Sequence, residues 1–378
     1  MRWENYILRS DEKFMPFWNE YLAQPRDILY IMGLGFDPRS VVGISNIYGV
    51  KSTGLRDTLI VRYYKNEKDK SSSTHAKVVE NLSTLTDFLS ANGHASFTEK
   101  DVIFRSDEDT SITALQSGGI IASTSDIEQY SDIIVDISAM PRSVFIPLIV
   151  KLLMLIDGHN ATPGVTVKNL HIVVAENPSL DGKIHDNGTD EEADYIHSLR
   201  AREISKYEDQ KEVWIPILGE NQEEQFAKIR KKLSPVETCP ILPFPSENLR
   251  RGDNLINKYG EMLFNDADFE TKNIVYADEG NPFHVYRLLN KTIERYNRSF
   301  QILEGCKIVV SALSSKLLTV GAFLSVYEQK TLGKNVGIMH VESLEHALDD
   351  DYETVKNEVE KNHKLFEIWL AGEPYIVL

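Results

Sequence analysis

The stretch ILYIMGLGFDPRS, residues 28–40, joins a run of apolar residues to a turn rich in glycine and charge. Ile28–Gly33 has the length and the composition of a strand, and it lacks the polar alternation of a strand with one face in water. A strand covered on both faces is typical of a central parallel sheet. The residues that follow, Gly33–Ser40, would lie at the carboxyl end of that strand, where open parallel sheets bind ligands.

Short apolar runs recur along the chain with longer amphipathic segments between them, a pattern that predicts an α/β fold. A helix is expected over Thr74–Ala91, and Pro240–Pro245 is expected to be an extended connection because proline removes hydrogen-bond donors. The remaining expected strands are Thr58–Tyr64, Asp101–Phe104, Asp132–Ile137, Leu170–Ala175, Val213–Leu218, Ile274–Ala277, Lys307–Ser311 and Val336–Val341.

These elements predict two Rossmann-like lobes with mainly parallel sheets flanked by helices. The first lobe would cover residues 1–180, a polar connector 181–210, and the second lobe 211–378, whose apolar C-terminal residues are expected to dock. Ile133–Leu153 and Lys307–Glu328 resemble one another, each running from a strand through Ser-Ala and a basic residue into an apolar helix. Any two strand-to-helix units share such patterning, so a duplication stays open.

The charge of the chain excludes some classes of function. With 41 Lys and Arg against 57 Asp and Glu among 378 residues, the formal net charge is −16. General binding of nucleic acid draws on clustered basic residues, so it is not expected here, whereas an acidic surface favours basic protein partners.

The chain is expected to be cytoplasmic and bacterial, without membrane association. Its two cysteines, Cys239 and Cys306, cannot form a disulfide framework, which fits a reducing compartment. The longest apolar stretch, Val144–Ile156, is shorter than the roughly 20 residues that cross a bilayer, and the N-terminus lacks the apolar core of a signal peptide.

The turn GLGFDPRS is the first candidate ligand site. Gly33 and Gly35 would let the backbone approach a ligand, and Asp37 and Arg39 offer an acceptor and a bidentate donor to anions. Pro38 stands where the dinucleotide fingerprint has its third glycine, so dehydrogenase chemistry is not expected. A tight turn with a surface arginine is the alternative.

The turn DISAMPRS, residues 136–143, is the second candidate. Asp136 ends an otherwise apolar strand, and a buried carboxylate needs a partner such as Arg39 or Arg142, in a structural ion pair or in a ligand site. Ser138 could contact phosphate or cap the following helix.

The turn SALSSK, residues 311–316, is the third candidate. Ser314, Ser315 and Lys316 at a helix start could cradle a phosphate or a carboxylate, or could simply cap the helix. A Ser/Lys nucleophile would need a geometry that sequence does not reveal.

Two further groups lie in the second half of the chain. Arg250 and Arg251 predict either an anion site or a salt-bridge hub. Asp278 and Glu279 follow a strand, where they could do acid–base work or could complement the dipole of the next helix. No phosphate loop, metalloprotease motif, hydrolase elbow or EF-hand is present, and neither a metal nor a cofactor is expected.

The arrangement GLGFDPRS, DISAMPRS and SALSSK, each after an expected buried strand, resembles the CARF and SAVED families of Rossmann-like sensor domains in prokaryotic antiviral systems. That resemblance covers the alternating pattern and the doubled lobe. It implies binding of cyclic or linear oligonucleotide messengers at strand ends. The effector nuclease that such sensors often carry is not recognisable here.

The leading hypothesis is a ligand-binding, regulatory protein for a nucleotide-like or phosphorylated molecule, acting in a multi-protein assembly of the antiviral kind. Loops from separate strands would then meet in a common electropositive hollow. One alternative is a nucleoside or NAD-type glycosidase or hydrolase that uses Asp136, Asp278 or Glu279. Another is a non-catalytic structural subunit with an acidic surface for a partner protein.

Overall fold

The structure is a computed structural model that describes residues 1–66, 74–94, 96–106, 111–177, 180, 183–186, 188–202, 210–264, 269–343, 346–348 and 352–376. The chain divides into two compact units. The flanking unit consists of Asn5–Leu180 and Asp350–Leu378, and the middle unit consists of Met1–Glu4 and Asp181–Asp349.

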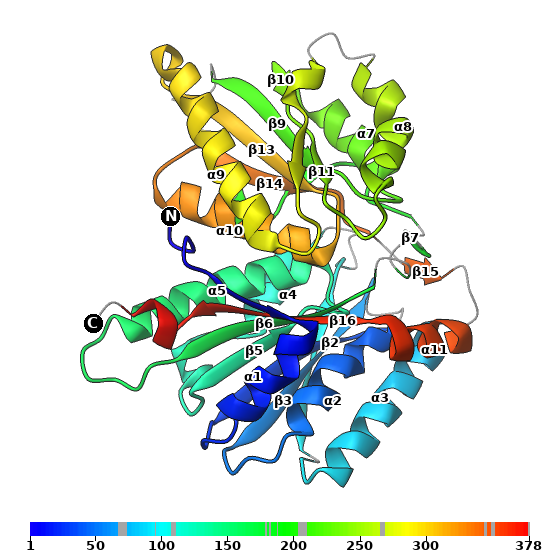
Figure 1. Ribbon diagram of the computed structural model, residues 1–378, viewed down its shortest axis with the longest axis vertical. Coiled ribbons are helices and arrows are strands. Elements are labelled where there is room, and N and C mark those ends of the chain that lie inside the picture. Colours follow the sequence, from blue (N-terminus) through cyan, green and yellow to red (C-terminus); the bar gives the residue numbers. More distant parts are fainter. Residues whose placement is uncertain are drawn as a thin grey trace. The chain divides into compact units, whose positions relative to one another are not determined.

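The flanking unit is built on a sheet with the strand order β1-β16-β6-β5-β2-β3-β4. Strands β2 to β6 pair in parallel, whereas β16 runs antiparallel to both β6 and β1. Figure 1 shows α4 and α5 on one face of this sheet and α1, α2 and α3 on the other. The bounds are β1 (Ile7–Ser10), α1 (Phe14–Tyr21), β2 (Ile28–Leu34), α2 (Val42–Tyr48), β3 (Arg56–Tyr64), α3 (Thr74–Ala91), β4 (Phe97–Ile103), α4 (Thr113–Gly119), β5 (Asp132–Asp136), α5 (Arg142–Asn160), β6 (Asn169–Glu176), α11 (Tyr352–Asn362) and β16 (Lys364–Ala371).

The middle unit has a sheet of order β12-β11-β9-β13-β14-β8, with β8 antiparallel and β10 paired to β9. A separate pair of strands, β7 and β15, completes the unit. The bounds are β7 (Ile184–Asp186), β8 (Asp194–Tyr195), β9 (Lys211–Ile217), α7 (Glu223–Lys232), β10 (Glu237–Thr238), β11 (Ile241–Pro243), α8 (Arg251–Phe264), β12 (Val275–Ala277), α9 (Pro282–Ser299), β13 (Cys306–Ala312), α10 (Lys316–Thr331), β14 (Val336–His340) and β15 (His346–Leu348). Short 3-10 turns are η1 (Asp11–Lys13), η2 (Pro38–Val41), η4 (Thr124–Ile127), η5 (His197–Leu199), η7 (Thr271–Asn273), η8 (Gln301–Leu303) and η9 (Glu373–Tyr375).

The expected α/β class is confirmed, because mainly parallel strands alternate with helices in both units. The two sheets also share one topology. The strand order β4-β3-β2-β5-β6-β16 corresponds to β12-β11-β9-β13-β14-β8, and the last strand of each series is antiparallel. The expected helix over Thr74–Ala91 is α3, and the resembling segments Ile133–Leu153 and Lys307–Glu328 fall on the equivalent units β5–α5 and β13–α10.

The division of the chain differs from the expected one at two places. Residues 350–378, expected in the second lobe, belong to the flanking unit, where β16 pairs with β6. Residues 181–210, expected as a connector, belong to the middle unit, where β8 pairs with β14. Strand pairing over a long sequence separation overrides the local change in composition that suggested the boundaries.

The proline-rich segment 240–245 also differs from its expectation, because β11 is an inner strand between β9 and β12. The prolines contribute acceptors to the sheet. The carbonyl of Pro240 accepts a hydrogen bond from the N–H of Val275 at 2.9 Å. A strand of three residues, Ile241–Pro243, needs few donors of its own.

Helix α5 is long and apolar enough to cross a bilayer by length and composition, and it is the one such helix in the described part of the chain. Most of its residues are buried within the unit, including Phe145, Leu148 and Leu152. A helix that is buried on nearly all sides within a protein is apolar all round, so it has the same composition as a helix that crosses a bilayer.

A fully buried ionic cluster fixes β16 in the flanking sheet. Nδ1 of His171 on β6 lies 2.7 Å from Oε1 of Glu367 on β16, and its Nε2 lies 3.6 Å from Oδ1 of Asp132 on β5. Glu367 also accepts a hydrogen bond from Arg9 at 2.6 Å, and Asp132 accepts one from the hydroxyl of Tyr21 at 2.5 Å. The cluster therefore ties together three strands of the sheet interior, the edge strand β1 and helix α1.

The position of His171 between two carboxylates determines its charge. Burial by itself would lower the pKa of His171, but the hydrogen bond with Glu367 and the Coulomb attraction of both Asp132 and Glu367 outweigh burial and raise the pKa. A protonated imidazole is what two adjacent buried carboxylates need as a partner.

We expect this cluster to make stability depend on pH. A histidine whose folded pKa is raised stabilises the fold fully below its unfolded pKa, about 6.5, and loses that contribution as pH rises through the folded pKa. His171→Asn should cost about 3–5 kcal/mol at about pH 5.5, because two buried carboxylates lose their cation. Urea unfolding of both proteins between about pH 5.5 and about pH 9 would measure the difference. The difference in the free energy of unfolding between the wild type and His171→Asn should shrink as pH rises. A difference that stays the same at every pH would contradict a charged imidazole at His171.

Candidate functional site

Each sheet has a topological switch point, where open α/β sheets bind ligands beyond the carboxyl ends of the strands. In the flanking sheet the chain runs from β2 outward to β3 and β4, and then returns to β5 on the other side of β2. In the middle sheet it runs from β9 to β11 and β12, and returns to β13. The sequence candidates lie at these two edges, which we call the flanking edge and the middle edge.

At the flanking edge the loop after β2 is held by its own charges. Asp37 accepts hydrogen bonds from the backbone N–H of Arg39 at 2.9 Å and from its guanidinium at 2.8–3.1 Å. Arg39 is only 2% exposed. Asn81 of α3 donates to the carbonyl of Gly35 at 2.8 Å. Arg39, expected to donate to an anionic ligand or else to be a surface arginine, is therefore a buried partner of Asp37, and its loss would disturb the loop itself.

The loop after β5 is likewise organised by internal hydrogen bonds. Asp136 accepts from the hydroxyl of Tyr30 at 2.7 Å and from the N–H of Ser138 at 2.9 Å. The hydroxyl oxygen of Ser138 accepts from the N–H of Ala175 at 2.8 Å. Gly43 of α2 allows this burial, because a Cβ there would lie 2.3 Å from the carboxylate of Asp136. Asp136 and Ser138 thus hold the loop in place.

Open space and polar groups nonetheless remain at the flanking edge. No atom of the described residues beyond its chain neighbours lies within 4 Å of where a Cβ on Gly35 would be, whereas Gly33 is in close contact with the hydroxyl of Tyr63. Helix α5 begins at Arg142 after the extended Pro141, which provides no side-chain cap. An uncapped start of a 19-residue helix favours negative charge, and Arg142 adds a cation there.

Two buried hydroxyls at this edge have no hydrogen-bond partner among the described residues. They are Oγ of Ser40, in η2 after β2, and the phenol oxygen of Tyr63, near the end of β3. Burial, followed by the negative charge of Asp136, raises the pKa of Tyr63 well above its ordinary value. Its hydroxyl therefore stays protonated and remains a donor. No pattern in the sequence marks either residue, since a serine in a turn and a tyrosine in a strand are common in α/β proteins.

The C-terminal helix α11 packs beside η2 at the flanking edge. Val355 and Val359 are buried, and Lys356 pairs with Glu80 of α3 at 3.0 Å. The sequence places α11 more than 300 residues from this loop, so only the pairing of β16 with β6 brings them together.

The loops at the middle edge pack against one another, whereas Gly35 at the flanking edge has space beside it among the described residues. A Cβ on Gly219, in the loop after β9, would lie 2.4 Å from the carbonyl oxygen of Leu313 and 2.7 Å from Cα of Ser314. The loops after β9 and β13 are therefore in direct contact. Ser315 caps α10 by accepting from the N–H of Leu318 at 3.3 Å, and Lys316 is the first residue of that helix.

Arg251 is the ion-pair hub of the middle edge. Its guanidinium binds both carboxylate oxygens of Glu220, at 2.8 and 2.6 Å, and also binds Glu279. Arg251 is 6% exposed, whereas the neighbouring Arg250 is exposed. Asp278 accepts from the N–H of Gly280 at 2.9 Å. Of the two alternatives for the arginine pair, the geometry of Arg251 is that of a salt-bridge hub.

In the described part of the chain, no group of three or more His, Cys, Asp or Glu side chains is placed to hold a metal ion. The stretch Val341–Glu353 is rich in acidic residues, which the sequence predicts to form a solvated face rather than a metal site. Its Glu345, Asp349 and Asp350 lie outside the described residues.

Gly219 and Gly35 test whether the middle edge is packed more tightly than the flanking edge. Gly219→Ala should destabilise the protein by about 1–3 kcal/mol, because the added methyl group meets backbone atoms that cannot rotate away. Gly35→Ala should change stability by less than about 0.5 kcal/mol, because its methyl group meets none of the described residues. Thermal unfolding of both variants measures this, and equal effects would mean that the two edges are equally packed.

No known family model matches the chain, and no curated protein matches it. Among solved structures it is similar to a universal stress protein from Archaeoglobus fulgidus DSM 4304, at 10% identity and a TM-score of 0.23, over 82% of this chain and 94% of that one. It is also similar to the cytoplasmic domain of a prokaryotic cation chloride cotransporter, at 10% identity and a TM-score of 0.22, over 85% of this chain and 97% of that one. Likenesses at these TM-scores do not indicate a function.

Proposed function

We propose that the flanking edge binds a nucleotide-like or otherwise phosphorylated small molecule. The observation that carries the proposal is the pair of buried hydroxyl donors, Ser40 and Tyr63, without an acceptor among the described residues. A buried polar group without a partner costs about 1–3 kcal/mol. Phosphate oxygens would supply acceptors, and the start of α5 with Arg142 would favour their negative charge.

Binding is a better fit to this chain than hydrolysis, because each proposed catalytic carboxylate already accepts hydrogen bonds from the protein. Asp136 accepts from Tyr30 and Ser138, Asp278 accepts from Gly280, and Glu279 binds Arg251. A glycosidase would need one carboxyl group directed at the substrate.

The proposal extends to a regulatory role in a multi-protein assembly of the bacterial cytoplasm, of the antiviral kind that the CARF and SAVED resemblance implies. A formal net charge of −16 favours a basic protein partner. Co-purification of the chain with such a partner would test this part separately from ligand binding.

Arg142→Ala should weaken binding at the flanking edge by roughly 10- to 100-fold, because it removes the binding free energy of one charge-assisted hydrogen bond. Isothermal titration with ATP, NAD, cyclic oligoadenylate and inorganic phosphate would measure it. Arg295→Ala, an exposed arginine on α9, serves as the control and should bind as the wild type does. The proposal fails if no probe binds, or if the two variants bind equally; conversion of a probe, seen by mass spectrometry, would favour the hydrolase instead.

Ser40→Ala and Tyr63→Phe separate a ligand contact from a structural one. Because neither hydroxyl has a partner in the described structure, their removal should leave the ligand-free protein as stable as the wild type, or up to about 1 kcal/mol more stable. Both variants should bind the ligand about fivefold to tenfold more weakly. Melting temperatures with and without ligand measure both effects. A ligand-free protein that is clearly destabilised would instead indicate that the hydroxyls support the fold.

A further inference from the structure

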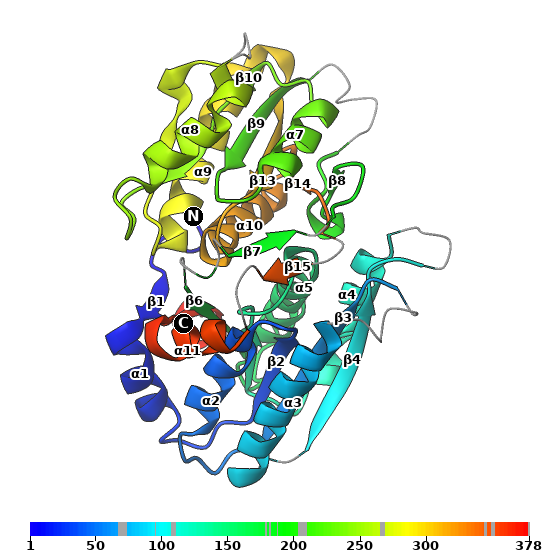
Figure 2. The same ribbon diagram turned by 90° about the vertical axis from the view of Figure 1, so that its right-hand side faces the viewer.

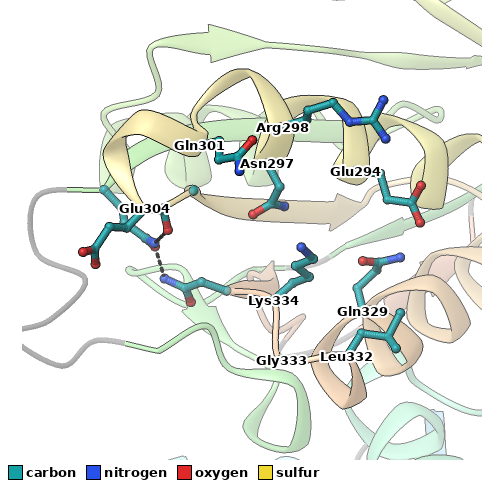
Figure 3. Close-up of a pocket in the computed structure, with 12 residues that line it drawn as sticks. Glu294, Asn297, Arg298, Gln301, Glu304, Gln329, Leu332, Gly333 and Lys334 are labelled. Carbon is teal, nitrogen blue, oxygen red and sulfur yellow. Dashed lines mark hydrogen bonds between the residues drawn. The ribbon is translucent and has the colours of Figure 1, made fainter.

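A polar pocket lies in the middle unit at the amino edge of its sheet, opposite to the middle edge. Its volume is about 770 Å³, within the usual range of ligand sites, roughly 300–1,000 Å³. Gln210, Gly305 and Asn335 line it just before β9, β13 and β14 begin. The C-terminal ends of α9 and α10 form the remaining walls (Figure 3).

One wall of the pocket is held rigid by amide side chains. Nε2 of Gln210 donates to the carbonyl of Glu304 at 2.9 Å, and Nδ2 of Asn335 donates to Oε1 of Gln210 at 2.8 Å. Oδ1 of Asn335 accepts from the N–H of Arg202 at 2.8 Å. Leu332 is the only apolar side chain among the described residues that line the pocket, so hydrogen bonds rather than apolar contact would hold a ligand.

Gln329 presents a buried acceptor that lacks a donor. The residue is 1% exposed, and its Nε2 donates to Oδ1 of Asn290 at 2.8 Å. Its Oε1 has no hydrogen-bond partner among the described residues. Figure 3 shows the Gln329 side chain rising from α10 between Lys334 and Glu294, toward the interior of the pocket.

The charges of the lining balance. Among the described lining residues, Glu294 and Glu304 are acidic and Arg298 and Lys334 are basic, so their formal sum is zero. The flanking edge, with Arg142 at a helix start, favours anions, whereas this pocket has no net preference for either sign. A ligand that donates and accepts hydrogen bonds without carrying charge fits the amides best.

We propose that this pocket binds a neutral, hydroxyl-rich molecule of sugar or polyol size, with one hydroxyl donating to Oε1 of Gln329. The remaining hydroxyls exchange hydrogen bonds with the walls, including Asn297 and Gln301 of the α9 side. This site is separate from the flanking edge and does not depend on the function proposed there.

The test is ligand-observed NMR of the full chain with D-glucose, trehalose and myo-inositol. Glycine betaine and inorganic phosphate stand as charged comparisons. At least one neutral probe should bind, and Gln329→Met, which keeps the volume and removes the acceptor, should weaken it about tenfold. Asn297→Ala, a half-exposed wall residue, gives a second variant with less risk to folding. Lys291→Ala, exposed on α9 and outside the lining, should bind as the wild type does.

The outcomes separate this proposal from its competitors. Binding of a neutral probe that is weakened by both Gln329→Met and Asn297→Ala, and retained by Lys291→Ala and Arg142→Ala, supports it. It is overturned if no neutral probe binds, which would leave water as the donor to Gln329, or if glycine betaine or phosphate binds more tightly. Equal affinity in the wild type and both wall variants also overturns it, because the probe would then lie elsewhere.

Discussion

The buried cluster of His171, Glu367 and Asp132 is the constraint on which the flanking sheet depends. Ionisable groups that are wholly removed from water need partners, and here each partner comes from a different strand. His171 and Glu367 are separated by 196 residues in the sequence. Only the insertion of β16 between β1 and β6 satisfies the three groups, and the same insertion carries α11 to the loop after β2. The cluster therefore links the closing of the sheet to the shape of the flanking edge.

The two units show how one topology can support different edges. Both sheets reverse their strand order between two parallel strands, and both follow the second of these with a long apolar helix that begins at a basic residue, Arg142 or Lys316. The difference lies in local packing. At the middle edge Gly219 lies against Leu313, and the hub at Arg251 neutralises its carboxylates, whereas Gly35 at the flanking edge faces open space. Fold topology locates two possible sites, and individual contacts distinguish them.

Much of the fold could be predicted from the sequence, because buried parallel strands have a strong local pattern. The runs at Ile28–Gly33 and Asp132–Ile137 lie on β2 and β5, and their loops meet at the switch point as the pattern indicates. Pairing over long distances has no local signal, so the sequence predicts residues 350–378 in the second lobe and 181–210 as a connector, whereas β16 pairs in the flanking sheet and β8 in the middle sheet. Side-chain roles were hardest to predict. A sequence shows that Arg39 and Asp37 are near each other, but it does not show that they bind one another, and it gives no sign that Ser40, Tyr63 and Gln329 are buried without partners.

The place of β16 has a consequence for the order in which the protein forms. The ribosome releases Met1–Glu4 and β1 to β6 first, then the rest of the middle unit, and only afterwards the strand that pairs with β6 and covers His171. Until then the newly made flanking sheet has an uncovered border at β6, with main-chain groups that can pair with any other extended chain. Residues 181–349 of the middle unit are an insertion within the flanking unit. The strands of the middle sheet are therefore all made before β16, and this unit can fold during synthesis while the flanking sheet is incomplete.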